Sequence, residues 1–170
     1  SPAQRWTDVV VGDISGSSVA VCLNDGTGGL LPAVISPVGS GPRGLTVLDV
    51  DSDGDTDVVT ANRVSGTCSL IRNNGNGTFQ PSVSFQGGVS NETSIVAADA
   101  NGDGITDLFV GGYSSQNVAI LLGNGAGGFT VSGTVAAGGR PWMMATDVAV
   151  DLISSRGLSA YRLLRLASAF

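Results

Sequence analysis

The stretch best suited to chemistry is DVDSDGDTDVV, residues 49–59, in which five aspartates occupy alternate positions. Gly54 allows the chain to fold back on itself, so the carboxylates converge and repel one another when the loop is empty. A hard cation relieves that repulsion. Oxygen ligands at loop positions 1, 3, 5 and 9, with a backbone carbonyl at position 7, suit Ca²⁺, whereas Mg²⁺ keeps several waters and takes fewer protein ligands. We therefore predict a calcium site in this loop.

A second loop, DANGDGITDLF at residues 99–109, repeats the spacing with an asparagine at its third position. Each loop offers one set of oxygen ligands, so about two Ca²⁺ ions are expected. The predicted ligands are Asp49, Asp51, Asp53, the carbonyl of Asp55 and Asp57 in the first loop, and Asp99, Asn101, Asp103, the carbonyl of Ile105 and Asp107 in the second.

An EF-hand loop begins with the same pattern, but it requires a bidentate glutamate at position 12 and a helix on each side. Here position 12 is Thr60 in the first loop and Val110 in the second, and both loops run into apolar, β-branched segments. These segments favour strands. The remaining alternative is that both loops are solvated Asp/Asn/Gly turns without a metal.

The elements that must position these loops come from an internal repeat. Three Gly/Asn-rich turns recur at offsets of 49 and 50 residues, namely NDGTGGLLPAV (24–34), NNGNGTFQPSV (73–83) and GNGAGGFTVSG (123–133). The same offsets align the apolar runs 19–23, 68–72 and 118–122, and they place the two acidic loops over each other. Several features in one order at one spacing indicate a repeat architecture.

Each repeat holds about four short apolar runs separated by tight polar turns, and such turns join antiparallel neighbours because a parallel crossover needs roughly a dozen residues. A period of about 40–50 residues with four strands is typical of a β-propeller blade. We predict an all-β fold of about three four-stranded antiparallel blades that form an incomplete ring. The predicted units are 1–48 (first repeat, truncated acidic loop), 49–98 (second repeat), 99–146 (third repeat) and 147–170 (degenerate fourth loop and C-terminal tail).

The composition excludes several classes of function. The 170 residues include no histidine, and all eight basic residues are arginines, so a Ser/His/Asp triad, a histidine-ligated zinc site and a lysine Schiff base are excluded. A net charge of −6 with scattered arginines argues against nucleic acid as a partner. No apolar run is long enough to span a membrane. We expect a protein that is not an enzyme; a glycan-active carboxylate pair is the remaining catalytic alternative.

The acidic charge is concentrated in the two loops, which hold five and three of the 14 acidic residues. Two bound Ca²⁺ ions would bring the net charge from −6 to −2. The negative charge is therefore mostly metal-site charge and not a surface for a basic partner. Calcium in these loops could stiffen each blade, or it could bridge directly to a ligand.

Together, the acidic loops and the Gly/Asn turns resemble the FG-GAP/VCBS-type repeat, the calcium-binding blade of secreted propellers and, more distantly, of integrin α-subunit heads. The resemblance covers about residues 7–153. It implies a secreted or cell-surface location, one Ca²⁺ per intact loop, and a role in adhesion, ligand binding or surface scaffolding with extracellular protein or carbohydrate as partners.

Three blades do not close a ring, since propellers have at least four. The partners that would complete the structure are missing blades of a longer chain or other copies of this chain. A head-to-tail contact between copies closes into a ring or continues as a filament. The alternative function is therefore a structural subunit of an extracellular fibre.

Three smaller features complete the prediction. Cys22 and Cys68 lie on corresponding strands of successive repeats and could form a disulfide. Two buried thiols are the favoured interpretation, because the two cysteines are three positions apart when the repeats are aligned. NGT at Asn76 and NET at Asn91 are possible glycosylation sites on predicted turns. A sugar-stacking set could be formed by Arg5, Trp6, Arg140, Pro141 and Trp142, but Trp142 precedes an apolar run and is expected to belong to the core.

Overall fold

A computed structural model describes residues 7–146, which form eleven strands in three antiparallel sheets and no helix. The first sheet contains β1 (Val9–Asp13), β2 (Ser18–Cys22) and β3 (Val34–Pro37). The second contains β4 (Pro42–Leu48), β5 (Asp57–Asn62), β6 (Thr67–Ile71) and β7 (Val83–Phe85). The third contains β8 (Glu92–Ala98), β9 (Asp107–Gly112), β10 (Asn117–Gly123) and β11 (Phe129–Ala136). The predicted fourth loop and tail lie outside the described residues.

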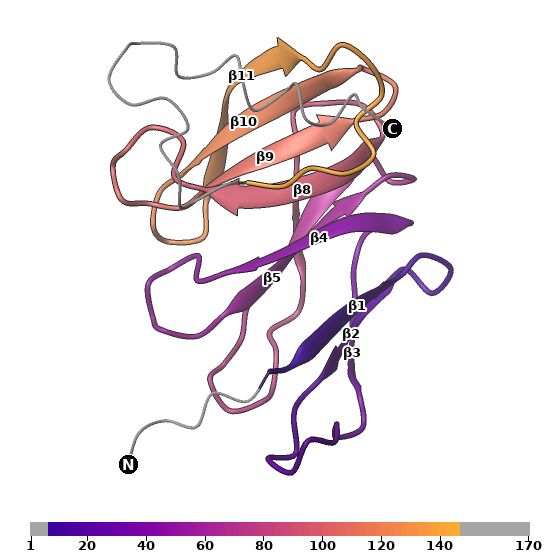
Figure 1. The fold of residues 1–170 in the computed structure, drawn as a ribbon, viewed down its shortest axis with the longest axis vertical. Coiled ribbons are helices and arrows are strands. Elements are labelled where there is room, and N and C mark those ends of the chain that lie inside the picture. Colours follow the sequence, from indigo (N-terminus) through magenta and orange to yellow (C-terminus); the bar gives the residue numbers. More distant parts are fainter. Residues whose placement is uncertain (1–6, 147–170) are drawn as a thin grey trace.

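The sheets are stacked in chain order, and within each sheet the strands follow one another as a meander (Figure 1). This arrangement confirms the predicted all-β fold of propeller-type blades without a closed ring. The second and third sheets each begin one strand before their acidic loop: β4 and β5 belong to one sheet and are connected by the first loop, and β8 and β9 belong to the next and are connected by the second. The acidic loop is therefore an internal connection of a blade. No helix that could cross a membrane is present between residues 7 and 146.

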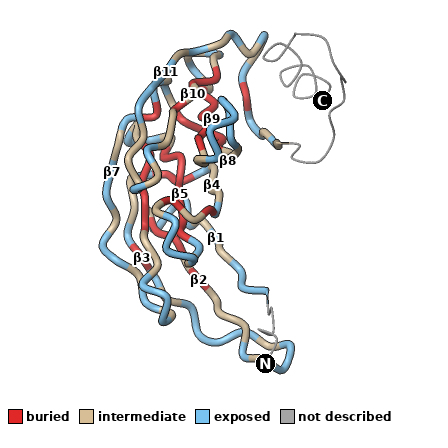
Figure 2. The backbone as a smooth tube through the Cα atoms, turned by 90° about the vertical axis from the view of Figure 1, so that its left-hand side faces the viewer, coloured by how far each residue is buried: buried red, intermediate tan, exposed pale blue. Residues whose placement is uncertain are grey.

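The hydrophobic core lies between neighbouring sheets (Figure 2). All six residues of β5 are buried, because the second sheet is covered on both faces. In β1, exposure alternates along the strand, and Val9 and Val11 are 40% and 49% exposed. Val11 aligns with Ala20 and Ile35 across the three strands, and Ile35 is 58% exposed. One face of the first sheet is thus apolar and uncovered.

The first strands of the second and third sheets approach each other closely. A Cβ atom added at Gly44 in β4 would lie 2.8 Å from the Cα of Ser94 in β8. Only glycine permits this backbone-to-backbone contact, because any side chain would push the two strands apart. The close contact fixes the position of the third sheet on the second, and with it the relative position of the two acidic loops.

The expectation that Trp142 belongs to the core is wrong, because its side chain is 50% exposed. No strand follows it in residues 141–146. This segment instead runs beside β8, where Thr93 Oγ1 donates to the Pro141 carbonyl and Thr146 Oγ1 donates to the Ala97 carbonyl. Trp142 therefore lies at the rim of the blade and not between sheets.

Candidate metal centre

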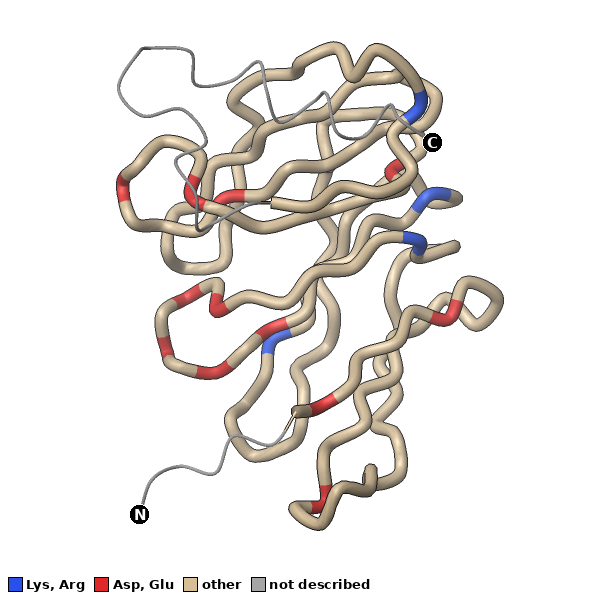
Figure 3. Tube along the Cα trace, viewed as in Figure 1, with Lys and Arg blue, Asp and Glu red and all other residues tan. Residues whose placement is uncertain are grey.

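Both acidic loops lie at the same rim of the molecule, because each connects the first strand of its sheet to the second. Figure 3 shows the acidic positions of the two loops gathered on this side. The first loop runs from the end of β4 at Leu48 to the start of β5 at Asp57, and the second runs from Ala98 to Asp107.

The first loop brings three of its predicted ligands together. Asp49, Asp51 and Asp57 each place one carboxylate oxygen so that the three oxygens lie within 4.8 Å of one another. Oδ1 of Asp51 is buried and has no hydrogen-bond partner. Converging carboxylates with an unsatisfied oxygen fit a hard cation such as Ca²⁺.

The remaining residues of the loop hold its backbone in a tight turn. Asp49 accepts hydrogen bonds from the N–H of Gly54 at 2.9 Å and of Asp53 at 3.2 Å, and Asp53 accepts one from the N–H of Asp55 at 2.8 Å. Gly54 has a φ of +92°, which a side chain would disfavour. The predicted function of this glycine, a sharp turn at loop position 6, is confirmed by its backbone.

The side chain at loop position 7 faces away from the carboxylate cluster. A Cβ atom added at Gly75 would clash with the Asp55 carboxylate, and one added at Gly125 would lie 3.8 Å from Ile105 Cδ1. Position 7 therefore packs its side chain on the Gly/Asn turn in both repeats. The carbonyl at position 7 stays a predicted ligand, since isoleucine has no other oxygen to offer.

Asp57 is the structural anchor of the first loop. It is 1% exposed, and its two oxygens accept hydrogen bonds from the N–H of Val50 at 3.0 Å and of Asn73 at 2.8 Å. Burial, with the nearby charges of Asp51 and Asp53, raises the pKa of Asp57 above its ordinary value although the two N–H groups lower it. A bound cation would favour the ionised form of this group.

The second loop has an equivalent anchoring aspartate, Asp107, but the side chains in the middle of the loop are arranged differently. Asp107 accepts hydrogen bonds from the N–H of Ala100 and of Gly123, both at 2.8 Å. Asn101 Nδ2 donates to Asp103 Oδ2 at 2.9 Å, so these two side chains contact each other. The N–H of Gly104, followed by that of Gly102, lowers the pKa of Asp99. Within residues 7–146, no three acidic side chains of this loop converge as those of the first loop do.

Within the described residues, the first repeat has an equivalent of the anchor. Asp8 Oδ1 accepts a hydrogen bond from the N–H of Asn24 at 2.7 Å, as Asp57 does from Asn73. The aspartate at loop position 9 thus connects the acidic side of a blade to its Gly/Asn turn in all three repeats.

Arg72 is a residue of the site that the sequence reasoning missed. Its Nε lies 3.5 Å from Asp51 Oδ2, and its Nη2 donates to the Ala126 carbonyl at 2.7 Å. The N–H of Gly127 donates to the Val50 carbonyl at 2.9 Å. Together these contacts join the first acidic loop to the turn of the third sheet. When the repeats are aligned, Arg72 occupies the position of Leu23 and Leu122. A charged residue at a position that is apolar in the other repeats was the signal that could have identified it.

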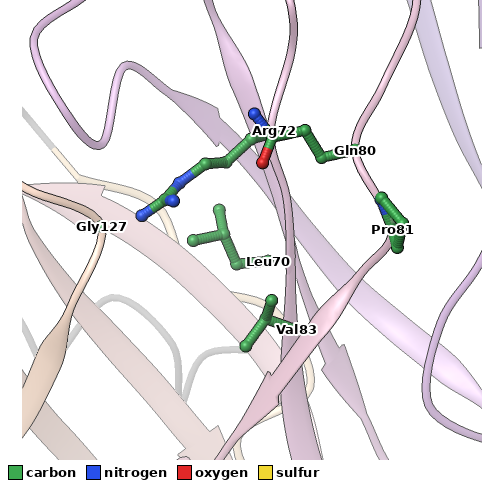
Figure 4. Close-up of a pocket in the computed structure, with 6 residues that line it drawn as sticks. All are labelled: Leu70, Arg72, Gln80, Pro81, Val83 and Gly127. Atoms are coloured by element: carbon green, nitrogen blue, oxygen red, sulfur yellow. The ribbon is translucent and has the colours of Figure 1, made fainter.

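A shallow pocket of about 140 Å³ adjoins Arg72 (Figure 4). It is lined by Leu70, Arg72, Gln80, Pro81, Val83 and Gly127. Because the Arg72 guanidinium reaches across to the turn of the third sheet, the pocket is an inter-sheet gap beside the acidic loop. It contains no carboxylate and no nucleophile.

Comparison with known proteins identifies the family. The model of the FG-GAP-like repeat matches residues 5–60 and 49–110, which together cover more than half of the chain. The chain belongs to the FG-GAP-like repeat family. No match was found among curated proteins.

Two solved structures are similar to parts of this FG-GAP-like chain at low sequence identity. A lectin of Agrocybe aegerita that recognises non-reducing terminal N-acetylglucosamine is 21% identical, with a TM-score of 0.49, over 76% of this chain and 34% of the lectin. The Photorhabdus luminescens Tc holotoxin pore with the TccC3-D651A mutation is 21% identical, with a TM-score of 0.44, over 76% of this chain and 6% of that chain. The FG-GAP-like chain thus spans about a third of the lectin.

The cysteines and sequons of the FG-GAP-like chain differ in their surroundings. Cys22 is half-buried, Cys68 is buried, and both are free thiols. Asn76 lies on an exposed turn, where its Oδ1 accepts from Thr78 and its Nδ2 is free of hydrogen bonds to described residues. Asn91 Nδ2 donates to the Arg63 carbonyl at 3.2 Å. Glycosylation uses the amide nitrogen, so Asn76 is the more accessible of the two predicted positions.

Ser52 offers a test of the loop geometry. It has a φ of +61°, and the corresponding residue of the second loop is Gly102, with a φ of +81°. Ser52→Gly is expected to stabilise the protein by about 1 kcal/mol, because the left-handed conformation costs roughly that amount in a residue with a Cβ atom. Denaturant unfolding would measure the difference. A destabilised Ser52→Gly variant would show that the serine side chain, and not the turn, determines this position.

Proposed function

We propose that this FG-GAP-like chain is a calcium-stabilised module of an extracellular β-propeller that serves adhesion, ligand binding or surface scaffolding and is not catalytic. The observation that carries the proposal is the convergence of Asp49, Asp51 and Asp57 in the first loop. The second loop has the same anchor and an asparagine oxygen at its third position, so it can accept the same ion once Asn101 and Asp103 turn towards it. Ca²⁺ would supply positive charge and fixed coordination at each loop.

The contacts around the first loop explain why metal binding would stabilise more than the loop itself. Asp57 connects the loop to the Asn73 turn of its own sheet, and Arg72 and Gly127 connect it to the third sheet. Neutralising the carboxylates lowers the repulsion at a point where two sheets meet. Calcium is therefore proposed to rigidify the junction between the blades.

Calcium is expected to raise the midpoint of thermal unfolding by several degrees relative to EDTA, because a ligand that binds only the folded state stabilises it. Asp53→Ala and Asp103→Ala should each remove part of this gain. Both substituted side chains are exposed, so the variants should fold normally in EDTA. Differential scanning calorimetry with Ca²⁺, Mg²⁺ and EDTA would measure the effect.

Asp25→Ala is the matched control, because Asp25 is an exposed aspartate on a turn outside the acidic loops. It accepts hydrogen bonds from the N–H groups of Thr27 and Gly29. Its loss should change stability equally with and without calcium. The proposal would be wrong if Ca²⁺ left the midpoint unchanged, or if Asp25→Ala abolished the gain as fully as Asp53→Ala.

A fibre subunit assembled head-to-tail is the second candidate, and the uncovered face of the first sheet favours it. When the repeats are aligned, Val9 corresponds to Val58. In the second blade, Val58 packs against the preceding sheet. The exposed face around Val9, Val11 and Ile35 thus has the character of a surface that another blade covers. Light scattering on the calorimetry samples would separate a monomer, a closed ring and a growing filament.

A further inference from the structure

Two aromatic rings and three arginines gather at the rim opposite the acidic loops. Arg43 lies at the start of β4, Arg63 directly follows β5, and Tyr113 directly follows β9. Arg140 and Trp142 follow β11. Figure 3 shows basic positions on this side of the molecule, away from the acidic positions of the two loops. We call these five residues the arginine–aromatic cluster.

The two rings form the centre of the cluster. Tyr113 and Trp142 stand edge to face with ring centroids 4.8 Å apart. The guanidinium carbon of Arg63 lies 4.8 Å from the Tyr113 centroid and 5.8 Å from that of Trp142. Arg43 lies 5.6 Å from the Trp142 centroid, and Arg140 lies 4.6 Å from that of Tyr113. Three positive charges are thus held close together by cation–π contacts.

These charges have no acidic partner among the described residues, where the one ion pair joins Arg72 to Asp51. Arg140 donates to the Tyr113 hydroxyl at 2.8 Å, but the side chains of Arg43 and Arg63 donate no hydrogen bond to residues 7–146. Glu92 begins the neighbouring strand, yet its buried carboxyl has no hydrogen-bond partner and packs against Gly87. The cluster therefore carries uncompensated positive charge on a protein of net charge −6.

A guanidinium that stacks on a ring uses its flat face, and its N–H donors stay free at the edge. A planar carboxylate matches these forked donors. Trp142 is 50% exposed, so apolar ring surface lies beside the free donors. A pyranose ring presents a rigid face of C–H groups to such a surface, whereas aspartate and glutamate side chains of a peptide have little apolar surface to offer.

We propose that the arginine–aromatic cluster binds an acidic saccharide, with a sugar carboxylate paired to Arg43 and Arg63 and a pyranose ring packed on Trp142. The inference names a ligand class for the binding function proposed above and rests on that function. It involves none of the proposed calcium ligands, so the two proposals can be tested apart.

Titration with trigalacturonate in EDTA, followed by tryptophan fluorescence and by calorimetry, tests the proposal. Binding is expected, and the methyl ester of the same trisaccharide should bind at least about tenfold more weakly, since one lost charge-assisted contact is worth roughly that factor. Arg63→Lys and Trp142→Ala should each cause a similar loss. Added salt should weaken binding, because the contact is electrostatic and exposed.

Arg72→Lys is the matched control, since it makes the same substitution at an arginine outside the cluster and keeps the charge. It should leave trigalacturonate binding unchanged, with folding of every variant checked by circular dichroism. Absence of binding by the folded protein, or equal weakening by Arg63→Lys and Arg72→Lys, would overturn the proposal. So would hexaglutamate binding as tightly as trigalacturonate, which would indicate an acidic protein segment as partner.

The two proposals fail in different ways. If trigalacturonate does not bind while Ca²⁺ still raises the unfolding midpoint, the saccharide inference is wrong and the calcium module stands. If trigalacturonate binds and Ca²⁺ leaves the unfolding midpoint unchanged, the cluster is a saccharide site and the calcium proposal is wrong.

Discussion

Asp57→Ala is expected to lower the free energy of unfolding by about 4 kcal/mol even without calcium, because each hydrogen bond to a charged group is worth roughly 1.5–3 kcal/mol and two are lost. The carboxylate is buried and accepts from the N–H groups of Val50 and Asn73. Alanine would leave both donors without a partner in the protein. Urea unfolding in EDTA would measure the change.

Asp53→Ala provides the contrast within the same loop. Asp53 is exposed and accepts a single backbone hydrogen bond, from Asp55. Its loss should matter mainly when calcium is present, whereas the loss of Asp57 should matter in both conditions. Equal destabilisation by the two substitutions in EDTA would contradict the view that Asp57 is a structural anchor as well as a metal ligand.

The sequence predicted the sheets well because turns of a few residues leave antiparallel neighbours as the only arrangement. The apolar run 68–72 is observed as the strand Thr67–Ile71, and the run 118–122 as Asn117–Gly123. Within the Gly/Asn turn 73–83, Phe79 forms an isolated bridge with Asn73, and the next strand begins only at Val83. A bridge and a strand have the same local pattern, so spacing alone does not separate them.

The sequence predicted the spacing of the candidate ligands but not the residues that surround them. The alternation of aspartates indicated convergence, and three carboxylates do converge. The contacts of Arg72 with Asp51 and with Ala126 depend on how the third sheet packs on the second. The rim position of Trp142 likewise depends on the path of residues 141–146 beside β8. Both are contacts between repeats, which a pattern within one repeat does not contain.

Comparison between repeats nevertheless marks the unusual residues. Arg72 stands in a column with two leucines, and Glu92 stands in a column with Pro42 and Pro141. In each case one repeat has a charge where the others are apolar. Arg72 acquires a partner for its charge, but Glu92 does not. The unpaired charge of Glu92 should therefore destabilise the protein.

Glu92→Gln is expected to stabilise the protein by about 2 kcal/mol at neutral pH, because both side chains are buried without a partner but only the carboxylate carries a charge, whose burial costs more than that of a neutral amide. Glu92 is fully buried at the start of β8, and neither carboxyl oxygen has a hydrogen-bond partner. Burial raises the pKa of Glu92, and burial, followed by the charge of Glu92, raises the pKa of the Cys68 thiol. Glutamine has nearly the same shape without the charge.

The pH dependence of this effect follows from the raised pKa of Glu92. Below the ordinary pKa of glutamate the folded and unfolded states are both protonated, so the charge causes no loss of stability. As the pH rises, the unfolded state releases its proton first, and the loss grows until the pH exceeds the pKa of the folded state. The advantage of Glu92→Gln should therefore be small near pH 4 and largest near pH 8, at about 2 kcal/mol.

Asp25→Asn is the control for removal of one negative charge, because Asp25 is exposed and its hydrogen bonds with Thr27 lower its pKa. The pKa shift of Asp25 is opposite in sign to that of Glu92, because folding favours the charged form of Asp25. The Asp25→Asn variant should therefore be no more stable than the parent protein at neutral pH. Urea unfolding of all three proteins between about pH 4 and pH 8 spans the expected change. A Glu92→Gln advantage that grew on acidification would mean that the Glu92 carboxylate is paired in solution, and that the second and third blades depend on its charge.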